Sequence, residues 1–422
     1  MSPGLAVAIT LSFTLSSSTV IAGPTTLVSV KSQNKQSNGA SSDPSASDTG
    51  QFIAFVSLAT NLAKPCSNGA NQIFVRDRTA GTITCVSVNS NGKQGDQDSH
   101  APSISSDGRF VAFDSAATNL TGGKCDNGFN HIFVRDQSEG TTTCVSVRSS
   151  GTEGNGDSFE PSISSDGQIV VFQSLATNLT TRCTNGNSHV YLHDLTTGQT
   201  KCLSVDSNED QGDGNSDLPR ISGDGLFVAF ESNATNLTSR CNNAFTQIFV
   251  RDLTNDETSC VSVDNDGNQG NNDSVQPSIS SDGQSVAYSS VATNLTATRC
   301  ITGNNQIFVR DRTTKETTCA SVDSKKIEGN GASTNPSISG SGNVVAFESI
   351  ANNLVKNDTN GILDVFAHDL PQSIQAAAAG AACGSSSFVA VSAADCRCDT
   401  SSALAARLSL ICSTNSTIVM GH

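Results

Sequence analysis

A unit of 58 or 59 residues occurs six times along this chain and restricts its fold more than any other feature of the sequence. Each copy is marked by one proline, and these are Pro44, Pro102, Pro161, Pro219, Pro277 and Pro336. A fixed period of this length indicates structurally equivalent units that stack, because one such unit cannot bury a hydrophobic face alone. The repeat therefore predicts a single architecture for residues 25–370 and excludes a membrane-spanning bundle and a coiled coil.

Each copy contains four strand-like runs, which are clearest in the second copy. These runs are Pro102–Ser105, Arg109–Asp114, His131–Asp136 and Thr142–Val147. The two middle runs are apolar on both faces and need cover on both sides, whereas the last run alternates as an outer strand does. Six four-stranded units stacked face to face describe a β-propeller, and an open solenoid is the alternative.

The two ends of the repeat favour a closed ring over a solenoid. Residues Thr25–Val30 read T-T-L-V-S-V and match Thr142–Val147, so a last strand precedes the first copy. The sixth copy ends after its third strand, at Asp369, and has no last strand of its own. We therefore predict that the N-terminal strand completes the sixth blade and closes the ring.

The repeat also resembles a known family. Residues 102–113 read P-S-I-S-S-D-G-R-F-V-A-F and residues 131–136 read H-I-F-V-R-D, a pattern that resembles the TolB-type six-bladed β-propeller repeat over about residues 25–370. With A-T-N-L after the second strand, the chain looks like secreted microbial proteins made only of such blades. The resemblance implies an all-β six-bladed propeller but little about function, since most members of that group have no assigned activity. The added cysteines and the C-terminal extension depart from the family pattern.

The two termini differ in composition from the repeats. Residues 1–22 contain no Asp, Glu, Lys or Arg, and Val20 and Ala22 fit the pattern before a signal-peptidase cut. We predict a signal peptide at 1–22, the propeller at 23–370 and a small Cys-rich extension at 371–422. The alternative for the first segment is a disordered or strand-forming terminus of a protein that is not exported. Within the extension, Phe388–Val391 is a candidate strand and Leu404–Ile411 a candidate amphipathic helix.

Ten cysteines recur as five pairs, each 19 residues apart: Cys66 and Cys85, Cys125 and Cys144, Cys183 and Cys202, Cys241 and Cys260, and Cys300 and Cys319. The sixth blade has Asp358 and Leu27 at these positions, so both partners are missing together from the blade assembled from the two ends. We therefore predict one disulfide within each of blades one to five, worth about 3 kcal/mol each. A zinc or redox role is disfavoured, because the spacing lacks Cys-x-x-Cys and a histidine nearby in the sequence.

Four further cysteines, Cys383, Cys396, Cys398 and Cys412, are expected to form two bridges in the extension, with all three pairings open. Fourteen cysteines in a polar chain indicate an oxidising compartment, so we expect a secreted protein that is extracellular or at the cell surface. The net charge of −15 without a basic block argues against a nucleic-acid partner. Two tyrosines and no tryptophan disfavour sugar binding by stacking.

Long loops are expected on one face of the propeller, where the second strand connects to the third and the fourth to the next blade. Binding residues usually lie on such loops. Asp96, Asp98, Asp157, Asp213 and Asp273 place carboxylates there, and Asn357–Gly361 is the best single calcium candidate. Solvated turns explain these residues better, so we predict no metal and no cofactor. Asp107, Asp166, Asp224 and Asp282 are interpreted as turn formers.

Catalytic signals are weak. No G-x-S-x-G or H-E-x-x-H motif is present. His193–Asp194 and His368–Asp369 stand where other blades have Arg-Asp, which favours a structural pairing over acid–base chemistry. His100, His131 and Glu160 break the six-fold pattern and are the candidates for an enzyme.

Four N-L-T sequons recur in register, at Asn119, Asn178, Asn236 and Asn294, and are candidate glycosylation sites. Blades one and six keep the asparagine without the threonine, at Asn61 and Asn353, so a turn explains the asparagine.

The repetition favours a non-catalytic secreted scaffold that presents disulfide-pinned loops for contact with a protein partner or with its own copies. Self-assembly into a filament or surface layer, through the long-loop face or the C-terminal extension, is the expected form. Donation of the strand Phe388–Val391 to a neighbouring copy is one such route. The alternative is a propeller hydrolase or lyase, with or without calcium, acting at the mouth of the central channel.

Overall fold

The computed structural model describes residues 26–32, 35–356, 358–370, 396–398 and 410–412. The chain divides into two compact units, Met1–Leu370 and Pro371–His422. All regular elements among the described residues are β-strands, and no helix there is long and apolar enough to cross a membrane. The predicted signal peptide, Cys383 and the candidate strand Phe388–Val391 lie outside the described residues.

The first unit is a six-bladed β-propeller, as predicted. Its blades one to three comprise β3 (Ser41–Ala46), β4 (Phe52–Ser57), β5 (Gln72–Asp77) and β6 (Thr82–Cys85); β7 (Ser99–Ile104), β8 (Phe110–Ser115), β9 (His131–Asp136) and β10 (Thr141–Cys144); and β11 (Ser158–Ile163), β12 (Ile169–Ser174), β13 (His189–Asp194) and β14 (Gln199–Cys202).

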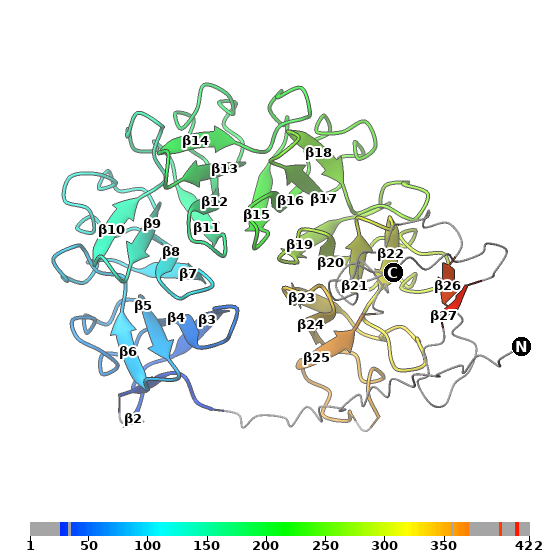
Figure 1. The fold of residues 1–422 in the computed structure, drawn as a ribbon, viewed down its shortest axis with the longest axis horizontal. Helices are drawn as coiled ribbons and strands as arrows, with labels where there is room; N and C mark the ends of the chain where they lie inside the picture. The colour runs from blue at the N-terminus through cyan, green and yellow to red at the C-terminus, as the bar shows by residue number, and fades with distance from the viewer. Residues whose placement is uncertain (1–25, 33–34, 357, 371–395, 399–409, 413–422) are drawn as a thin grey trace, which may run out of the picture. The chain divides into compact units, whose positions relative to one another are not determined.

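Blades four to six comprise β15 (Ser216–Ile221), β16 (Phe227–Ser232), β17 (Gln247–Asp252) and β18 (Glu257–Cys260); β19 (Ser274–Ile279), β20 (Ser285–Ser290), β21 (Gln306–Asp311) and β22 (Glu316–Cys319); and β23 (Ser333–Ile338), β24 (Val344–Ser349) and β25 (Asp364–Asp369). A short hairpin of β1 (Val30–Lys31) and β2 (Lys35–Gln36) precedes blade one. Each blade is an antiparallel meander in chain order, and the blades follow one another around the propeller from blue to orange (Figure 1).

The first strand of every blade is longer than the sequence indicated, because it pairs on both sides of a β-bulge. In blade two, Ser99 pairs with Ser115 before the register shifts between His100 and Ser103. The residue before the marker proline has a positive φ in all six blades, at Asp43, Ala101, Glu160, Leu218, Gln276 and Asn335. In blades three to six, this left-handed residue donates its N–H to a side chain of the preceding blade, as from Leu218 to Gln173 and from Asn335 to Gln276.

Neighbouring blades share hydrophobic cores, which confirms that the middle strands are covered on both faces. Val111, Phe113 and Phe133 of blade two are fully buried and pack with Val56 and Val75 of blade one. One aromatic pair stacks across the two middle strands of each blade, with ring centroids 5.8 to 6.0 Å apart. Equivalent shared cores join blades two to three, three to four, four to five, and five to six.

The predicted ring closure is not seen among the described residues, which begin at Thr26, inside the predicted closing strand. Within this part of the chain, blade six has three strands, and β25 pairs only with β24. Val28 packs on the core of blade one, as its counterpart Val86 packs in the core shared with blade two. The Val30 N–H donates to the Val28 carbonyl (2.8 Å), as the Val322 N–H donates to the Ala320 carbonyl after the fourth strand of blade five. The segment is therefore placed like the end of a fourth strand, but Thr26 and Leu27 are not in a strand and do not pair with β25.

The second unit has one described ladder, in which β26 (Cys396–Cys398) pairs antiparallel with β27 (Leu410–Cys412). Cys396 is opposite Cys412 in this register. Ile411 is thus in a strand, and the helix that we expected to end there does not include it.

Candidate functional site

Five disulfides form as predicted, one within each of blades one to five. They join Cys66 to Cys85, Cys125 to Cys144, Cys183 to Cys202, Cys241 to Cys260 and Cys300 to Cys319. Each bond ties the loop after the second strand to the fourth strand, with Cα atoms 6.0 to 6.4 Å apart. The five bonds indicate an oxidising environment, extracellular or periplasmic.

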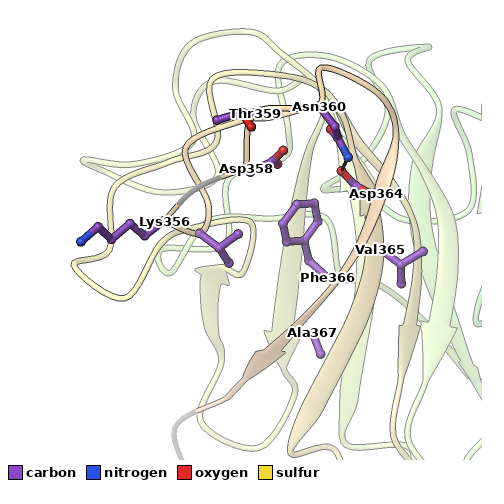
Figure 2. Close-up of a pocket in the computed structure, with 9 residues that line it drawn as sticks. Lys356, Asp358, Thr359, Asn360, Asp364, Val365, Phe366 and Ala367 are labelled. Atoms are coloured by element: carbon purple, nitrogen blue, oxygen red, sulfur yellow. Dashed lines mark hydrogen bonds between the residues drawn. The ribbon is translucent and has the colours of Figure 1, made fainter. Parts of the chain in front are cut away.

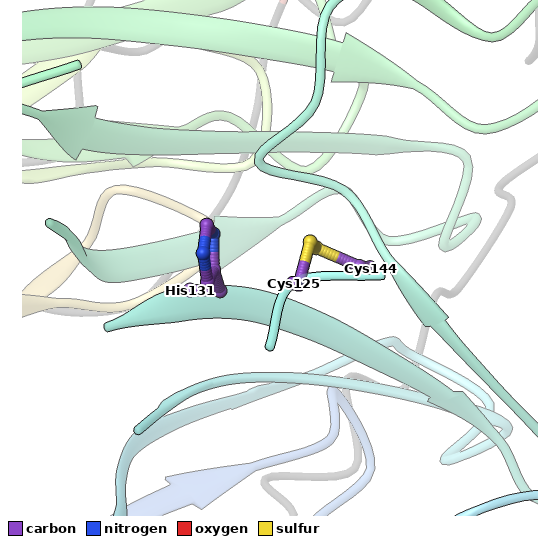
Figure 3. A group of neighbouring side chains, drawn as sticks. All are labelled: Cys125, His131 and Cys144. Carbon is purple, nitrogen blue, oxygen red and sulfur yellow. A yellow bond between two sulfur atoms is a disulfide. The ribbon is translucent and has the colours of Figure 1, made fainter. Parts of the chain in front are cut away.

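Two of these disulfides lie beside a buried histidine. In blade two, the His131 ring lies beside the Cys125–Cys144 bond (Figure 3). His131 Nδ1 is 2.9 Å from Ser146 Oγ, and His131 Nε2 is 2.8 Å from Asn127 Oδ1. Burial lowers the pKa of His131 and lowers that of the equivalent His189 to about 4, so both imidazoles are neutral at physiological pH. His131 was a candidate for the channel mouth, and the structure corrects this: the residue is buried beside the disulfide.

The same position is glutamine in blades one, four and five, at Gln72, Gln247 and Gln306. Each glutamine oxygen accepts a hydrogen bond from the serine that corresponds to Ser146, which shows that the histidine takes over a structural task. The proximity of histidine to the cysteine pair was missed in the sequence, although His131 follows Cys125 by only six residues. The sequence feature that could have revealed this proximity is the occurrence of histidine at this position in blades two and three alone.

The long-loop face is held together by side-chain amides. In blade two, Asn119 Oδ1 accepts the Asp96 N–H (3.1 Å), and Asn119 Nδ2 donates to the Gln94 carbonyl (2.9 Å). The corresponding asparagine makes the same two bonds in every other blade, including Asn61 and Asn353, which are not followed by threonine. Sequon occupancy at Asn119, Asn178, Asn236 and Asn294 stays a prediction, and the asparagines have a structural role regardless.

The acidic residues of this face are also used internally. Asp96 and Asp213 each accept from the backbone and hydroxyl of a threonine in the neighbouring loop. Asp98, Asp157 and Asp273 each accept the backbone N–H of the residue immediately before the third strand. Among the described residues, the clusters suited to a metal contain cysteine and histidine, and none consists of carboxylates.

The Arg-Asp and His-Asp doublets are structural, and in blades two and three their two members bond to different groups. Arg135 donates to Thr142 Oγ1 (3.0 Å), and His193 takes the same role toward Thr200 (2.9 Å). Asp136 and Asp194 accept backbone N–H groups of the following turn. The turn-forming assignment of Asp107, Asp166, Asp224 and Asp282 is confirmed by equivalent bonds from the neighbouring serine and backbone.

The central channel contains a charged cluster that departs from the six-fold repeat. His100, Asp114, Asn130, Glu160 and Arg220 line a cavity of about 1010 Å³ that the first strands of all six blades border. His100 lies opposite Asp114 across the strand pair, and Arg220 bonds to Glu160 at 3.2 Å. The sequence candidates His100 and Glu160 are therefore brought together, and Asp114 is the member that sequence reasoning missed.

Asp114 is almost completely buried, and burial raises its pKa to about 6. Its carboxylate accepts from Asn130 Nδ2 (2.9 Å) and from the backbone of Glu160, the left-handed residue before Pro161. Gln173 and Glu231 accept the equivalent N–H from Leu218 and Gln276 in the next two blades. The position thus joins adjacent blades, and in blades two and four the residue at the joint, Asp114 or Glu231, is a titratable carboxyl group whose pKa burial raises.

The outer edge of blade six is uncovered. Val365 of β25 is 77% exposed, whereas Ile73, Ile132, Val190, Ile248 and Ile307 at the same position of the other blades are 0% exposed. A pocket of about 500 Å³ lies beside this edge, lined by Val355, Lys356 and residues 358–360 of the loop and by residues 364–367 of β25 (Figure 2). In blades one to five, the fourth strand and the disulfide occupy this place.

Neither a protein-family description nor a curated protein sequence matches the chain. Solved structures that resemble it include TolB from Acinetobacter baumannii, with 19% identity and a TM-score of 0.42 over 73% of this chain and 62% of that one. A putative TolB from Agrobacterium tumefaciens is 13% identical with a TM-score of 0.42, covering 80% and 92%. The propeller domain of the Trilobed protease from Pyrococcus furiosus is 12% identical with a TM-score of 0.48, covering 78% and 83%.

Proposed function

We propose that the protein is a non-catalytic, secreted scaffold that assembles with its own copies through the outer edge of blade six. The N-terminal segment of one copy, residues 24–27, would pair with β25 of the next copy as its fourth strand. The uncovered edge of β25 is the observation that carries this proposal. Adding a strand to an exposed sheet edge is a recurring mode of protein recognition.

The other five blades define the missing contact. In each, an N–H just after the fourth strand donates to the carbonyl of the residue equivalent to Val365, as from Val86 to Ile73 and from Val145 to Ile132, both at 2.9 Å. The same bond recurs for Leu203, Val261 and Ala320. Val365 has no such partner among the described residues. Its carbonyl and N–H, by the same register, point outward from β25.

The N-terminal segment has the sequence of a fourth strand. Its T-T-L-V-S-V at residues 25–30 matches residues 142–147 of blade two, and Val30 bridges Gln36 as Val88 bridges Gln94. Leu27 is 60% exposed, so it offers apolar surface that pairing would cover. Because Val28 and Val30 contact blade one, a chain that donates residues 24–27 to another copy keeps its own fold. Such head-to-tail exchange extends without closing unless the geometry returns to the first copy.

The missing disulfide gives a direct test. Leu27 and Asp358 stand where blade one has Cys85 and Cys66, so the double variant L27C/D358C supplies the sixth pair. We expect non-reducing electrophoresis to show a ladder of covalent oligomers that collapses on reduction. The single variants L27C and D358C are the controls and should give no ladder. A covalently closed monomer would mean that the chain completes its own ring, and absence of the bond would mean that strand 24–27 does not reach β25 at all.

A second variant tests the edge without cysteines. Val365→Lys places a charge on the exposed edge, and Leu226→Lys places one on an exposed leucine of blade four as the matched control. We expect V365K to raise the concentration needed for assembly by about tenfold or more, in light scattering and particle images, and L226K to leave it unchanged. Equal assembly of the two variants would overturn the proposal.

The channel cluster favours a second candidate, a hydrolase or lyase acting at the channel mouth. The supporting observation is Asp114, whose pKa of about 6 suits a general acid or base and which faces His100 in a large cavity. Screening glycosidic, ester and peptide substrates with wild type and D114N tests this. Turnover that D114N abolishes would establish an enzyme, and equal background rates would exclude this site.

A further inference from the structure

Blades two and three contain a group that the other blades lack. In each, one imidazole and the two sulfurs of the disulfide have ligand atoms within 4.8 Å of one another: His131 with Cys125 and Cys144, and His189 with Cys183 and Cys202. Figure 3 shows the His131 ring beside the Cys125–Cys144 bond. All six residues are buried. Two thiolates and an imidazole are the donors that zinc prefers.

The remaining disulfide blades provide an internal comparison. Gln72, Gln247 and Gln306 begin the third strand of blades one, four and five, and they make the same bond to a buried serine that His131 and His189 make. Glutamine is therefore sufficient for the structural hydrogen bond at this position. The histidines add a nitrogen donor for a soft or borderline metal that an amide does not supply.

We propose that reduction converts the Cys125–Cys144 and Cys183–Cys202 disulfides into two buried zinc sites, completed by His131 and His189. A phosphine reductant supplies two electrons to each S–S bond, and water supplies the two protons and the oxygen of the phosphine oxide, giving two thiols. A dithiol supplies both the electrons and the protons and is itself oxidised to a disulfide. Zn²⁺ then displaces the two thiol protons and is bound by two thiolates and one neutral imidazole. A water molecule or the amide oxygen of Asn127 or Asn185 remains for the fourth position.

The backbone already has the separation that this conversion needs. The Cα atoms of both cysteine pairs are 6.4 Å apart. Two sulfurs bound to one tetrahedral zinc lie about 3.8 Å apart, given Zn–S bonds of about 2.3 Å, so rotation of the cysteine side chains is sufficient. Both nitrogens of each imidazole have a polar neighbour, Ser146 and Asn127 for His131 and Ser204 and Asn185 for His189. Whichever nitrogen binds the ion, the other keeps a partner that orients the ring.

The consequence is a difference among blades under reducing conditions. Blades one, four and five lose their cross-link when reduced, whereas blades two and three regain one from the metal. Because zinc binds the folded site, it stabilises these two blades by mass action. This inference concerns blades two and three and does not depend on the pairing proposed for β25.

The test uses the full chain with the four C-terminal cysteines replaced, C383S/C396S/C398S/C412S, so that they bind no metal. The protein is reduced with a phosphine, titrated with Zn²⁺ alone, and analysed by native mass spectrometry, with Co²⁺ absorption as a second readout of thiolate ligation. We expect two ions per chain, one for each cluster. H131Q and H189Q, which install the residue of the other blades, should each remove one ion or weaken its binding by about tenfold or more.

A gain of function completes the design. Gln247→His in blade four should add a further zinc ion, because Cys241 and Cys260 are already in place. Protease resistance and melting temperature of the oxidised H131Q and H189Q proteins should equal those of the parent chain. Zinc binding that is unchanged in the H131Q/H189Q double variant, as expected if reduction unfolds the blades and exposes their thiols, would overturn the proposal. Absence of zinc binding in the reduced parent would overturn it as well.

Discussion

Blade three and blade six contain the same three inner strands, yet their third strands have opposite environments. β13, with the sequence H-V-Y-L-H-D, is buried at five of its six positions, while β25, D-V-F-A-H-D, alternates half-buried and exposed residues. The two sequences are similar in hydropathy, so composition does not explain the difference. Blade three has a fourth strand, a disulfide and a following blade, whereas blade six has none of these among the described residues. Burial of the third strand therefore depends on the fourth strand, the disulfide and the next blade that cover it, and not on its own sequence.

The largest expected effect compares an aromatic residue of the same strand in a covered and an uncovered blade. Phe249 of β17 is fully buried, and Phe366 of β25 is half-buried at the equivalent position. We expect F249A to lower the free energy of unfolding by about 3 to 5 kcal/mol and F366A to cost about half as much, because less surface and a smaller cavity are involved. Urea unfolding of the two variants measures this. Equal losses would show that β25 is covered in solution.

Removing one disulfide makes a covered blade more like blade six. C183S/C202S should lower stability by about 3 kcal/mol, because a loop of about 20 residues is no longer closed in the unfolded chain. Hydrogen exchange should quicken in β13 and β14 and stay unchanged in β17. If the amide hydrogens of β17 exchange faster to the same extent, the blades unfold as one unit, and the disulfide does not stabilise its own blade selectively.

Two glycines test the joint between blades. Gly167 of blade three and Gly50 of blade one both have positive φ, but a Cβ at Gly167 would lie 2.2 Å from the ring of Phe110, whereas one at Gly50 meets only Arg78. G50A should cost about 1 kcal/mol from the backbone alone. G167A should cost about 1 to 3 kcal/mol more, because the Phe110 ring must move. Similar losses at the two sites would indicate that blade six packs against Gly50.

The smallest effect concerns Asp114, the titratable joint between blades two and three. Its pKa is about 6 in the folded protein and near 3.8 when unfolded, so the folded state binds the proton more tightly. Its contribution to stability is greatest below pH 3.8 and is lost as the pH rises through 6. From pH 7 to pH 5 the wild type should gain about 1 kcal/mol relative to D114N, in paired thermal melts. If the stability difference between wild type and D114N does not change with pH, the Asp114 carboxyl group is exposed to solvent in the folded protein.

Much of this architecture was predictable because it depends on contacts that are local or repeated. The turn formers such as Asp107 bond within two residues, and each cysteine pair spans one hairpin. The position of His131 beside its disulfide is equally local, but the sequence did not show why histidine can replace glutamine there. The structure shows the reason, because both side chains bond to the equivalent buried serine, Ser146 in blade two and Ser87 in blade one. Asp114 was missed because its partner, Glu160, comes from the next blade.

The sequence by itself determined the number of blades, the order of their strands and the five cross-links, since periodic hydrophobicity and paired cysteines act over short chain distances. Only the tertiary structure decided the state of the blade-six edge, because residues 25–30 match a fourth strand in sequence and yet β25 has no fourth-strand partner among the described residues. The counterparts of Val28, such as Val86, pack on the following blade while the strand before them pairs within its own blade. Pairing at the edge of β25 therefore depends on the distance between blade one and blade six, which is a property of the folded molecule and not of the segment.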